Sequence, residues 1–98
     1  PRTAIGVMPD GTTVYLMVVD GRRYTYSNGM YLNVLADMFH ALGCKEALNL
    51  DGGGSSTFIV ARGGQLGDPQ RMDVRNWPND GGGVERLLHN GLAIIVNK

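Results

Sequence analysis

The sequence predicts a small α+β domain in which a mixed sheet of about five to six strands packs against one main helix. Three observations lead to this fold class. Apolar runs of strand length recur between turn-forming glycine, proline and aspartate residues. One stretch has the apolar spacing of an amphipathic helix. The 98 residues leave room for a single domain over residues 1–98, and no repeat or linker divides them.

Three strands are predicted before the helix. The first covers residues 3–8 and ends at Pro9-Asp10-Gly11, which is a strong hairpin signal. The second covers residues 13–19, where a continuous apolar run is typical of a strand buried on both faces. Residues 22–26 alternate polar and aromatic side chains, which favours a short edge strand.

The helix is expected between Leu32 and Leu42. Apolar side chains recur there at helical spacing and form one stripe, at positions 32, 35, 36, 39 and 42. Gly43 stands where a glycine commonly ends a helix.

Shorter strands are expected after the helix. Residues 47–50 and 57–61 flank a sharp turn, and a further short strand is predicted over residues 71–74. The apolar run 92–96 predicts a last strand in the centre of the sheet.

Composition and charge exclude several classes of protein. Lysine plus arginine is 9 and aspartate plus glutamate is 9, which argues against a dedicated nucleic-acid surface or a polybasic membrane patch. Apolar runs are far shorter than the roughly 20 residues of a membrane-spanning helix. One cysteine makes no internal disulfide, and no cluster has metal-ligand spacing, so neither a metal nor another cofactor is expected. The start at Pro1 has no secretory leader and suggests a processed product or a fragment.

Glycine is the unusual feature of the composition. It makes up 15 of 98 residues, about twice the usual share of roughly 7%, and two triplets begin at Gly52 and Gly81. Because glycine allows left-handed backbone and close approach, candidate chemistry is sought at these triplets.

The densest candidate site surrounds the first triplet. Asp51 is expected at the end of a buried strand, which places a carboxylate at the rim of the sheet. The glycine N–H groups after it can face an anion, as in phosphate-binding loops, and Ser55 and Ser56 add hydroxyl groups. A tight turn in which Asp51 bonds its own backbone is the plainer alternative. No lysine follows the glycines, so this is not a Walker loop.

A second polar stretch lies around the other triplet. It supplies two carboxylates, a guanidinium and two side-chain amides that together suit a polar cleft, from Asn76, Asp80, Glu85, Arg86 and Asn90. Trp77 would stack on a sugar face there. By spacing alone, a solvated loop whose Asp and Asn residues make turns is favoured, because nothing in this stretch fits a strict catalytic template.

These motifs occur in a recognisable order. The chain contains Pro1-Arg2-Thr3-Ala4-Ile5-Gly6, then Ser27-x-Gly29-Met30, then Leu50-Asp51-Gly52-Gly53-Gly54-Ser55-Ser56, then Asn76-x-Pro78-x-Asp80-Gly81, and finally Glu85-Arg86 with Asn90. Over nearly its whole length the sequence resembles the phosphodiester glycosidase family. The resemblance implies that residues 1–98 form the C-terminal part of such a domain, with an upstream segment of the same protein or another copy as partner.

The resemblance also implies an activity and its residues. Family members hydrolyse a sugar-1-phosphodiester, here of the N-acetylglucosamine-1-phosphodiester type found in glycoconjugates or exopolysaccharides, to free sugar and phosphomonoester. The family favours a secreted or cell-surface location. The catalytic candidates are Asp51 and Glu85, and the substrate-binding candidates are Arg2, Thr3, Gly52, Gly53, Gly54, Ser55, Asn76, Asp80, Arg86 and Asn90.

Two other functions stay open. A non-catalytic carbohydrate- or phosphate-binding module would keep the cleft but lack the upstream contribution to catalysis. An assembly domain would reuse the fold and tolerate substitution of Asp51.

Overall fold

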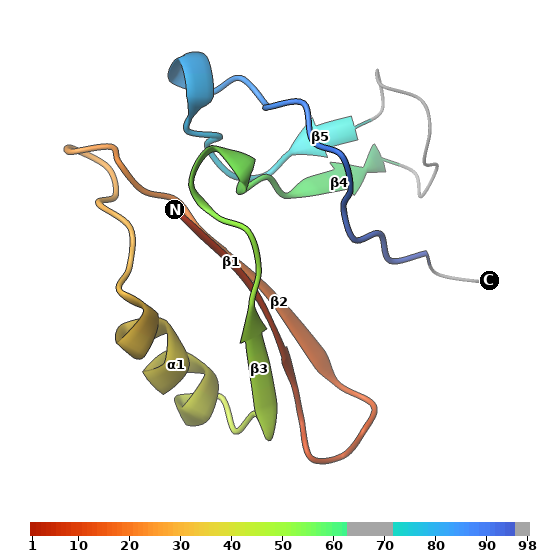
Figure 1. Ribbon diagram of the computed structural model, residues 1–98. Helices are drawn as coiled ribbons and strands as arrows, with labels where there is room; N and C mark the ends of the chain where they lie inside the picture. Colours follow the sequence, from red (N-terminus) through yellow and green to blue (C-terminus); the bar gives the residue numbers. More distant parts are fainter. Residues whose placement is uncertain (63–71, 96–98) are drawn as a thin grey trace.

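The computed structural model describes residues 1–62 and 72–95, which form five strands and one α-helix (Figure 1), so the α+β class is confirmed. The strands belong to two antiparallel sheets. One has the order β2-β1-β3 and the other pairs β4 with β5. In chain order the elements are β1 (Arg2–Val7), β2 (Val14–Val19), α1 (Leu32–Ala41), β3 (Glu46–Asn49), β4 (Ile59–Ala61) and β5 (Met72–Val74).

The predicted hairpin joins β1 to β2. The Asp10 carboxylate closes it by accepting the backbone N–H groups of Thr12 and Thr13 at 2.8 and 2.9 Å. It also accepts the Thr13 hydroxyl at 2.8 Å. These bonds stabilise the ionised form and hold the pKa of Asp10 below its usual value of 3.8.

β2 is not buried on both faces, so that prediction is wrong. Tyr15 and Met17 pack toward the core, whereas Val14 and Leu16 are 48% and 38% exposed on the opposite face. Helix α1 supplies the core residues against one face, and the alternation of a strand sends every second side chain to the other.

The core lies between α1 and the three-stranded sheet. Leu35 and Phe39, one helical turn apart, are each 3% exposed and pack with Ala4, which is 2% exposed. Gly43 follows the helix with a φ of +87°, and its N–H donates to the carbonyl of His40 at 2.9 Å. Both the helix and its glycine terminator are therefore confirmed.

Two of the strand predictions are wrong. Residues 22–26 form a turn, because Arg22 adopts a φ of +54° and Arg23 pairs with Ser27 through backbone hydrogen bonds of 2.8 and 2.9 Å. Residues 92–95 form no strand, and Ile94 and Ile95 are 59% and 70% exposed. A strand needs a neighbour for its backbone groups, and the described chain offers this run none. Positions 71 and 96 of the predicted strands lie outside the described residues.

Strand β3 is exposed at all four positions, so Asp51 does not follow a buried strand as predicted. The inner edge of β3 pairs with β1, in a register that sets Leu48 opposite Ile5. Within the described residues its outer edge has no partner strand. Nor does the described part of the chain contain a helix with the length and apolar character needed to cross a bilayer.

Gly6→Ala should destabilise the fold by about 1–3 kcal/mol through overpacking. A Cβ atom at Gly6 would lie 2.5 Å from Cδ1 of Phe39 and 2.9 Å from Sγ of Cys44. Urea unfolding measures the effect. Gly91→Ala is the matched control, since a Cβ there meets no atom within 4 Å. Equal unfolding midpoints for the two variants would contradict this account of the core.

Candidate functional site

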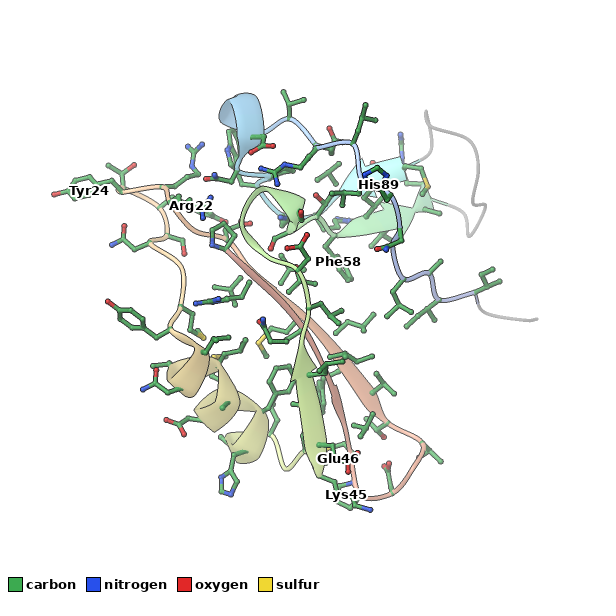
Figure 2. All side chains as sticks on the ribbon, in the orientation of Figure 1. Arg22, Tyr24, Lys45, Glu46, Phe58 and His89 are labelled. Carbon is green, nitrogen blue, oxygen red and sulfur yellow. The ribbon has the colours of Figure 1, made fainter. Side chains whose placement is uncertain are left out.

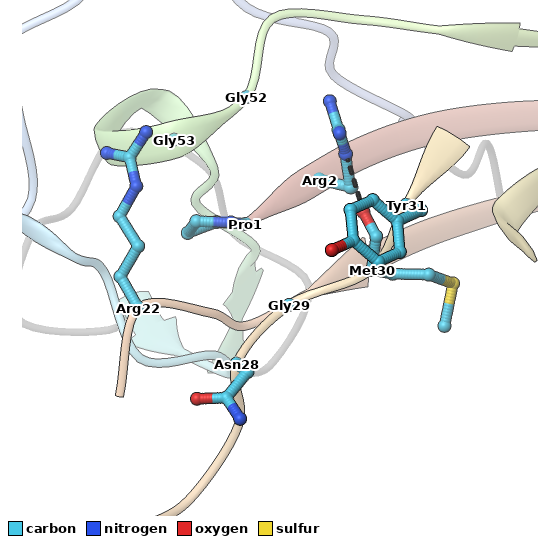
Figure 3. A pocket seen from close by; sticks show the side chains of 9 residues that line it. All are labelled: Pro1, Arg2, Arg22, Asn28, Gly29, Met30, Tyr31, Gly52 and Gly53. Carbon is cyan, nitrogen blue, oxygen red and sulfur yellow. Dashed lines mark hydrogen bonds between the residues drawn. The ribbon is translucent and has the colours of Figure 1, made fainter. Parts of the chain in front are cut away.

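The three-stranded sheet brings several loops together at one end. The start of β1, the turn after β2, the approach to α1 and the turn after β3 enclose a pocket of about 540 Å³ (Figure 3). Two guanidinium groups, an aromatic ring and two glycines of the first triplet are in its lining, which consists of Pro1, Arg2, Arg22, Asn28, Gly29, Met30, Tyr31, Gly52 and Gly53. Three of the predicted substrate-binding residues therefore lie here, namely Arg2, Gly52 and Gly53.

The triplet turn uses its own backbone donors. Asp51 Oδ1 accepts the N–H of Gly52 at 3.0 Å, and the Pro1 carbonyl accepts the N–H of Gly53 at 3.1 Å. The N–H of Ser55 donates to the carbonyl of Gly52 at 3.1 Å. In this conformation Gly52 and Gly53 thus have no N–H free for a ligand, and the self-bonded turn that the sequence left open is present at Asp51.

Arg2 reaches the pocket from β1. Its Nε donates to the Met30 carbonyl at 2.9 Å, which holds the guanidinium against the approach to α1 (Figure 3). The other two guanidinium nitrogens meet no acceptor among the described residues. The exposed Tyr31 ring, at 80% exposure, stands at the rim of the pocket.

Asp80 and Arg86 form an ion pair over Gly54. Nε of Arg86 donates to Oδ2 of Asp80 at 2.6 Å, and Nη2 donates to Oδ1 at 3.1 Å. This pairing holds the pKa of Asp80 below its usual value of 3.8 and raises the pKa of the Arg86 guanidinium. Gly54 is buried beneath the pair, and a Cβ there would collide with both side chains. The pair borders the triplet from the side of Gly54 and is not part of the pocket lining.

The side chain of Asn76 has a structural role in this conformation, because it hydrogen-bonds three other parts of the chain. Its Oδ1 accepts the N–H of Phe58 at 2.7 Å. Its Nδ2 donates to the Ser56 carbonyl at 2.8 Å and to Asp20 at 3.1 Å. Both amide hydrogens are therefore engaged within the chain.

Asp20 and Thr3 extend this polar link. The two oxygens of Asp20 accept the N–H of Trp77 at 2.9 and 3.0 Å. The hydroxyl of Thr3 donates to that of Ser56, which is 1% exposed, at 2.9 Å. Thr3 thus joins β1 to the segment after the triplet instead of lining the pocket.

Trp77 is already in contact with a cation. The Arg23 guanidinium lies 4.0 Å from the ring centroid, which is a cation–π distance, so one face of the indole is covered. Glu85 and Asn90 are exposed, and neither they nor Ser55 line the pocket. The aromatic side chain in the pocket lining is therefore that of Tyr31, not that of Trp77.

Six residues of the pocket lining were not among the predicted site residues, namely Pro1, Arg22, Asn28, Gly29, Met30 and Tyr31. Arg22 was assigned to a predicted edge strand. Its position directly after the turn-forming pair Asp20-Gly21 was the feature of the sequence that could have indicated a cation in a loop. In the described ranges, 1–62 and 72–95, no group of three or more histidine, cysteine, aspartate or glutamate side chains is arranged to hold a metal ion.

Comparison with known proteins adds an independent result. The sequence model of the phosphodiester glycosidase family matches residues 1–95. The SPbeta prophage-derived uncharacterized protein YomE of Bacillus subtilis (strain 168) is 46% identical over 60 residues. Those residues are 61% of this chain but 9% of that relative, so the matched part spans less than a tenth of its length.

Arg86→Gln should raise the pKa of Asp80 toward 3.8, because the bond that stabilises its carboxylate is removed. Carbon-13 NMR titration of the Asp80 carboxyl measures this shift.

The ion pair also makes the stability of the fold depend on pH. Since the folded pKa of Asp80 lies below the unfolded value, the stabilisation by the ion pair is complete above about pH 3.8 and disappears as the pH falls through the folded pKa. Asp80→Asn should therefore lose more stability at neutral pH than in acid, and a pH-independent loss would contradict the ion pair.

Proposed function

The chain belongs to the phosphodiester glycosidase family, and from that membership we propose that it hydrolyses a sugar-1-phosphodiester to free sugar and phosphomonoester. The proposed substrate is of the N-acetylglucosamine-1-phosphodiester type. One observation supports this most directly. The pocket beside the triplet combines two guanidinium groups for an anion with an aromatic ring for a sugar. Asp51 is not part of the pocket lining, but its carboxylate accepts the N–H of Gly52, which is.

The proposed reaction makes and breaks one bond at the sugar. The oxygen of water joins the anomeric carbon, and the bond from that carbon to the phosphate oxygen breaks. Its electron pair leaves with the phosphomonoester, while the proton of water passes to a carboxylate. Because a phosphomonoester is already a good leaving group, a general acid matters less than in other glycosidases. The site must chiefly stabilise the phosphate anion and the positive charge that develops on the sugar.

Asp51 is the proposed carboxylate for that work. Its Oδ1 is held by the N–H of Gly52 at 3.0 Å, which orients the group and leaves Oδ2 for water or for the sugar. Glu85 is the second proposed carboxylate. It is exposed on the segment after the Asp80–Gly82 turn, so it takes part only if that segment approaches the bound substrate.

Arg2 is the proposed phosphate ligand from β1, and Tyr31 is proposed to border the sugar.

The other predicted site residues have less support for a direct contact with the substrate in this conformation. Asn76 already supports the fold through its amide, and the Asp80–Arg86 pair acts through its contact with Gly54. Ser55, Thr3 and Asn90 remain candidates for contacts made when a ligand is bound.

A binding or assembly role is the second candidate function. The observation that favours it is the position of Glu85 and Asn90, which are exposed and outside the pocket lining. A site with one proposed carboxylate nearby suits binding of a sugar phosphate without turnover.

We also propose that the chain works with a partner strand, as the C-terminal part of a larger domain. The outer edge of β3 has no partner strand in residues 1–62 and 72–95, and Leu48 on it is 61% exposed. An apolar groove of about 190 Å³ runs beside it, between β3 and α1. An upstream segment of the same protein or another copy of this chain would satisfy this edge.

Sugar release from an N-acetylglucosamine-1-phosphodiester tests the proposed activity. Asp51→Asn should lower kcat by about 100- to 10,000-fold, because the base is lost. Asparagine keeps a side-chain oxygen for the N–H of Gly52, so the turn is retained. Asp37→Asn, on an exposed position of α1, is the matched control and should leave kcat unchanged.

Three outcomes of this assay are informative. Full activity in Asp51→Asn would remove Asp51 from the mechanism. Sugar-phosphate binding by folded protein without any release would favour the binding module. Neither binding nor release would favour assembly.

The partner strand is tested by light scattering over a range of concentrations. If a second copy pairs along β3, the mass should approach that of a dimer, and Leu48→Lys should restore the monomer because it places a charge at the edge. A wild-type monomer at every concentration excludes the second copy and leaves the upstream segment as the proposed partner.

A further inference from the structure

Arg22 has an unusual backbone. Its φ of +54° makes it the one non-glycine residue with positive φ in the described ranges. L-residues with long side chains rarely adopt the left-handed region, and such residues persist where the surrounding structure holds them. Positions of this kind concentrate at functional sites, so the observed conformation leads to the question of what the side chain does.

The turn is held on both sides of Arg22. After it, Arg23 and Ser27 exchange backbone hydrogen bonds of 2.8 and 2.9 Å. Before it, Asp20 is bound by Asn76 and by the N–H of Trp77, and its own carbonyl accepts the Ser27 hydroxyl at 2.7 Å. Gly21 is buried, with its Cβ position only 2.9 Å from Cα of Gly29. These contacts hold the backbone on either side of Arg22, whose side chain lines the pocket.

The guanidinium of Arg22 points toward Gly53, and both residues line the pocket (Figure 3). Nη1 and Nη2 lie 3.3 and 3.4 Å from the position that a Cβ of Gly53 would occupy. In the part of the chain that the structure describes, no carboxylate lies within salt-bridge distance of Arg22. Its charge still acts locally, since it contributes to lowering the pKa of Asp80.

Arg2 lines the same pocket and likewise has no carboxylate partner among the described residues. Two cations on one pocket repel each other, and an anion between them removes that cost. The N–H groups of Gly52 and Gly53 are already engaged within the chain, so the two arginine side chains are the charged donors that the pocket lining offers to an anion.

We infer that Arg22 is a specificity-determining residue that binds the phosphodiester group and so selects a sugar phosphodiester over a neutral glycoside of the same sugar. The planar guanidinium offers two parallel N–H donors that match two phosphate oxygens. The left-handed turn keeps this fork aimed at the pocket before a ligand arrives. The inference rests on the proposed function for the identity of the ligand.

Two variants separate the side chain from the backbone. Arg22→Gly removes the guanidinium but accepts a φ of +54°, so the turn is retained. Arg22→Lys keeps the charge and loses the fork. Lys45→Gln is the control, because Lys45 is an exposed cation at the opposite end of the three-stranded sheet (Figure 2).

The experiment is an NMR titration with dimethyl phosphate and, separately, with N-acetylglucosamine, at low ionic strength. Arg22→Gly should weaken dimethyl phosphate binding by about 10- to 100-fold, and Arg22→Lys by less. The control should bind as the wild type does. Binding of N-acetylglucosamine should not change in any variant, which a merely structural role for Arg22 would not predict.

Activity assays on the same variants separate the two hypotheses. Turnover by the wild type with unchanged KM in both Arg22 variants would overturn the inference and leave the proposed function intact. Weakened dimethyl phosphate binding in Arg22→Gly, with no turnover by the wild type, would support the phosphate site while the proposed activity fails. Absence of dimethyl phosphate binding by the wild type, or equal loss of both ligands in Arg22→Gly, would overturn the inference.

Discussion

The carboxylate of Asp20 joins the two sheets, and the site depends on that junction. It stands at the end of β2 and accepts hydrogen bonds from Asn76 and from the backbone of Trp77, far along the chain. Asn76 in turn bonds Phe58 and Ser56 on either side of Thr57. The turn after β2, the segment after the triplet and the Trp77 loop are thereby held at one end of the three-stranded sheet. An acceptor-only group at this place satisfies several backbone and amide donors at once, which no apolar side chain does.

The first glycine triplet is a point of close packing in the structure. Its glycines allow close approach by other parts of the chain: the Pro1 carbonyl at Gly52, the Arg22 guanidinium at Gly53 and the Asp80–Arg86 pair at Gly54. The backbone N–H groups that a phosphate loop would present are partly spent on Asp51 and Pro1. Positive charge is therefore brought to the pocket by arginine side chains. The same lack of side chains that makes a loop suitable for an anion also makes it suitable for packing against cations.

Local patterns in the sequence predicted the local structure well. The β1–β2 hairpin, the helix stripe that buries Leu35 and Phe39, and the glycine that ends the helix each depend on residues a few positions apart. Features that depend on distant partners were not predictable in this way. Residues 92–95 have the composition of a strand without a neighbour to pair with, and Arg22 enters the pocket because Asp20 is bound by residues more than fifty positions away. The family motif located Arg2, Gly52 and Gly53 in the pocket, but it did not show that Asn76 supports the fold.

The open edge of β3 and the candidate site lie close together. β3 ends at Asn49, two residues before Asp51, and its outer edge is unpaired in the described chain. A strand added along that edge, in either direction, has one end beside Asn49. Its terminal residues would therefore lie near the triplet and the proposed carboxylate. Among the described residues the core contains few fully buried apolar side chains, so burying Leu48 and the groove beside it would also stabilise the sheet. Completing the sheet and completing the site would then be a single event, which links the activity proposed for this chain to the partner proposed for β3.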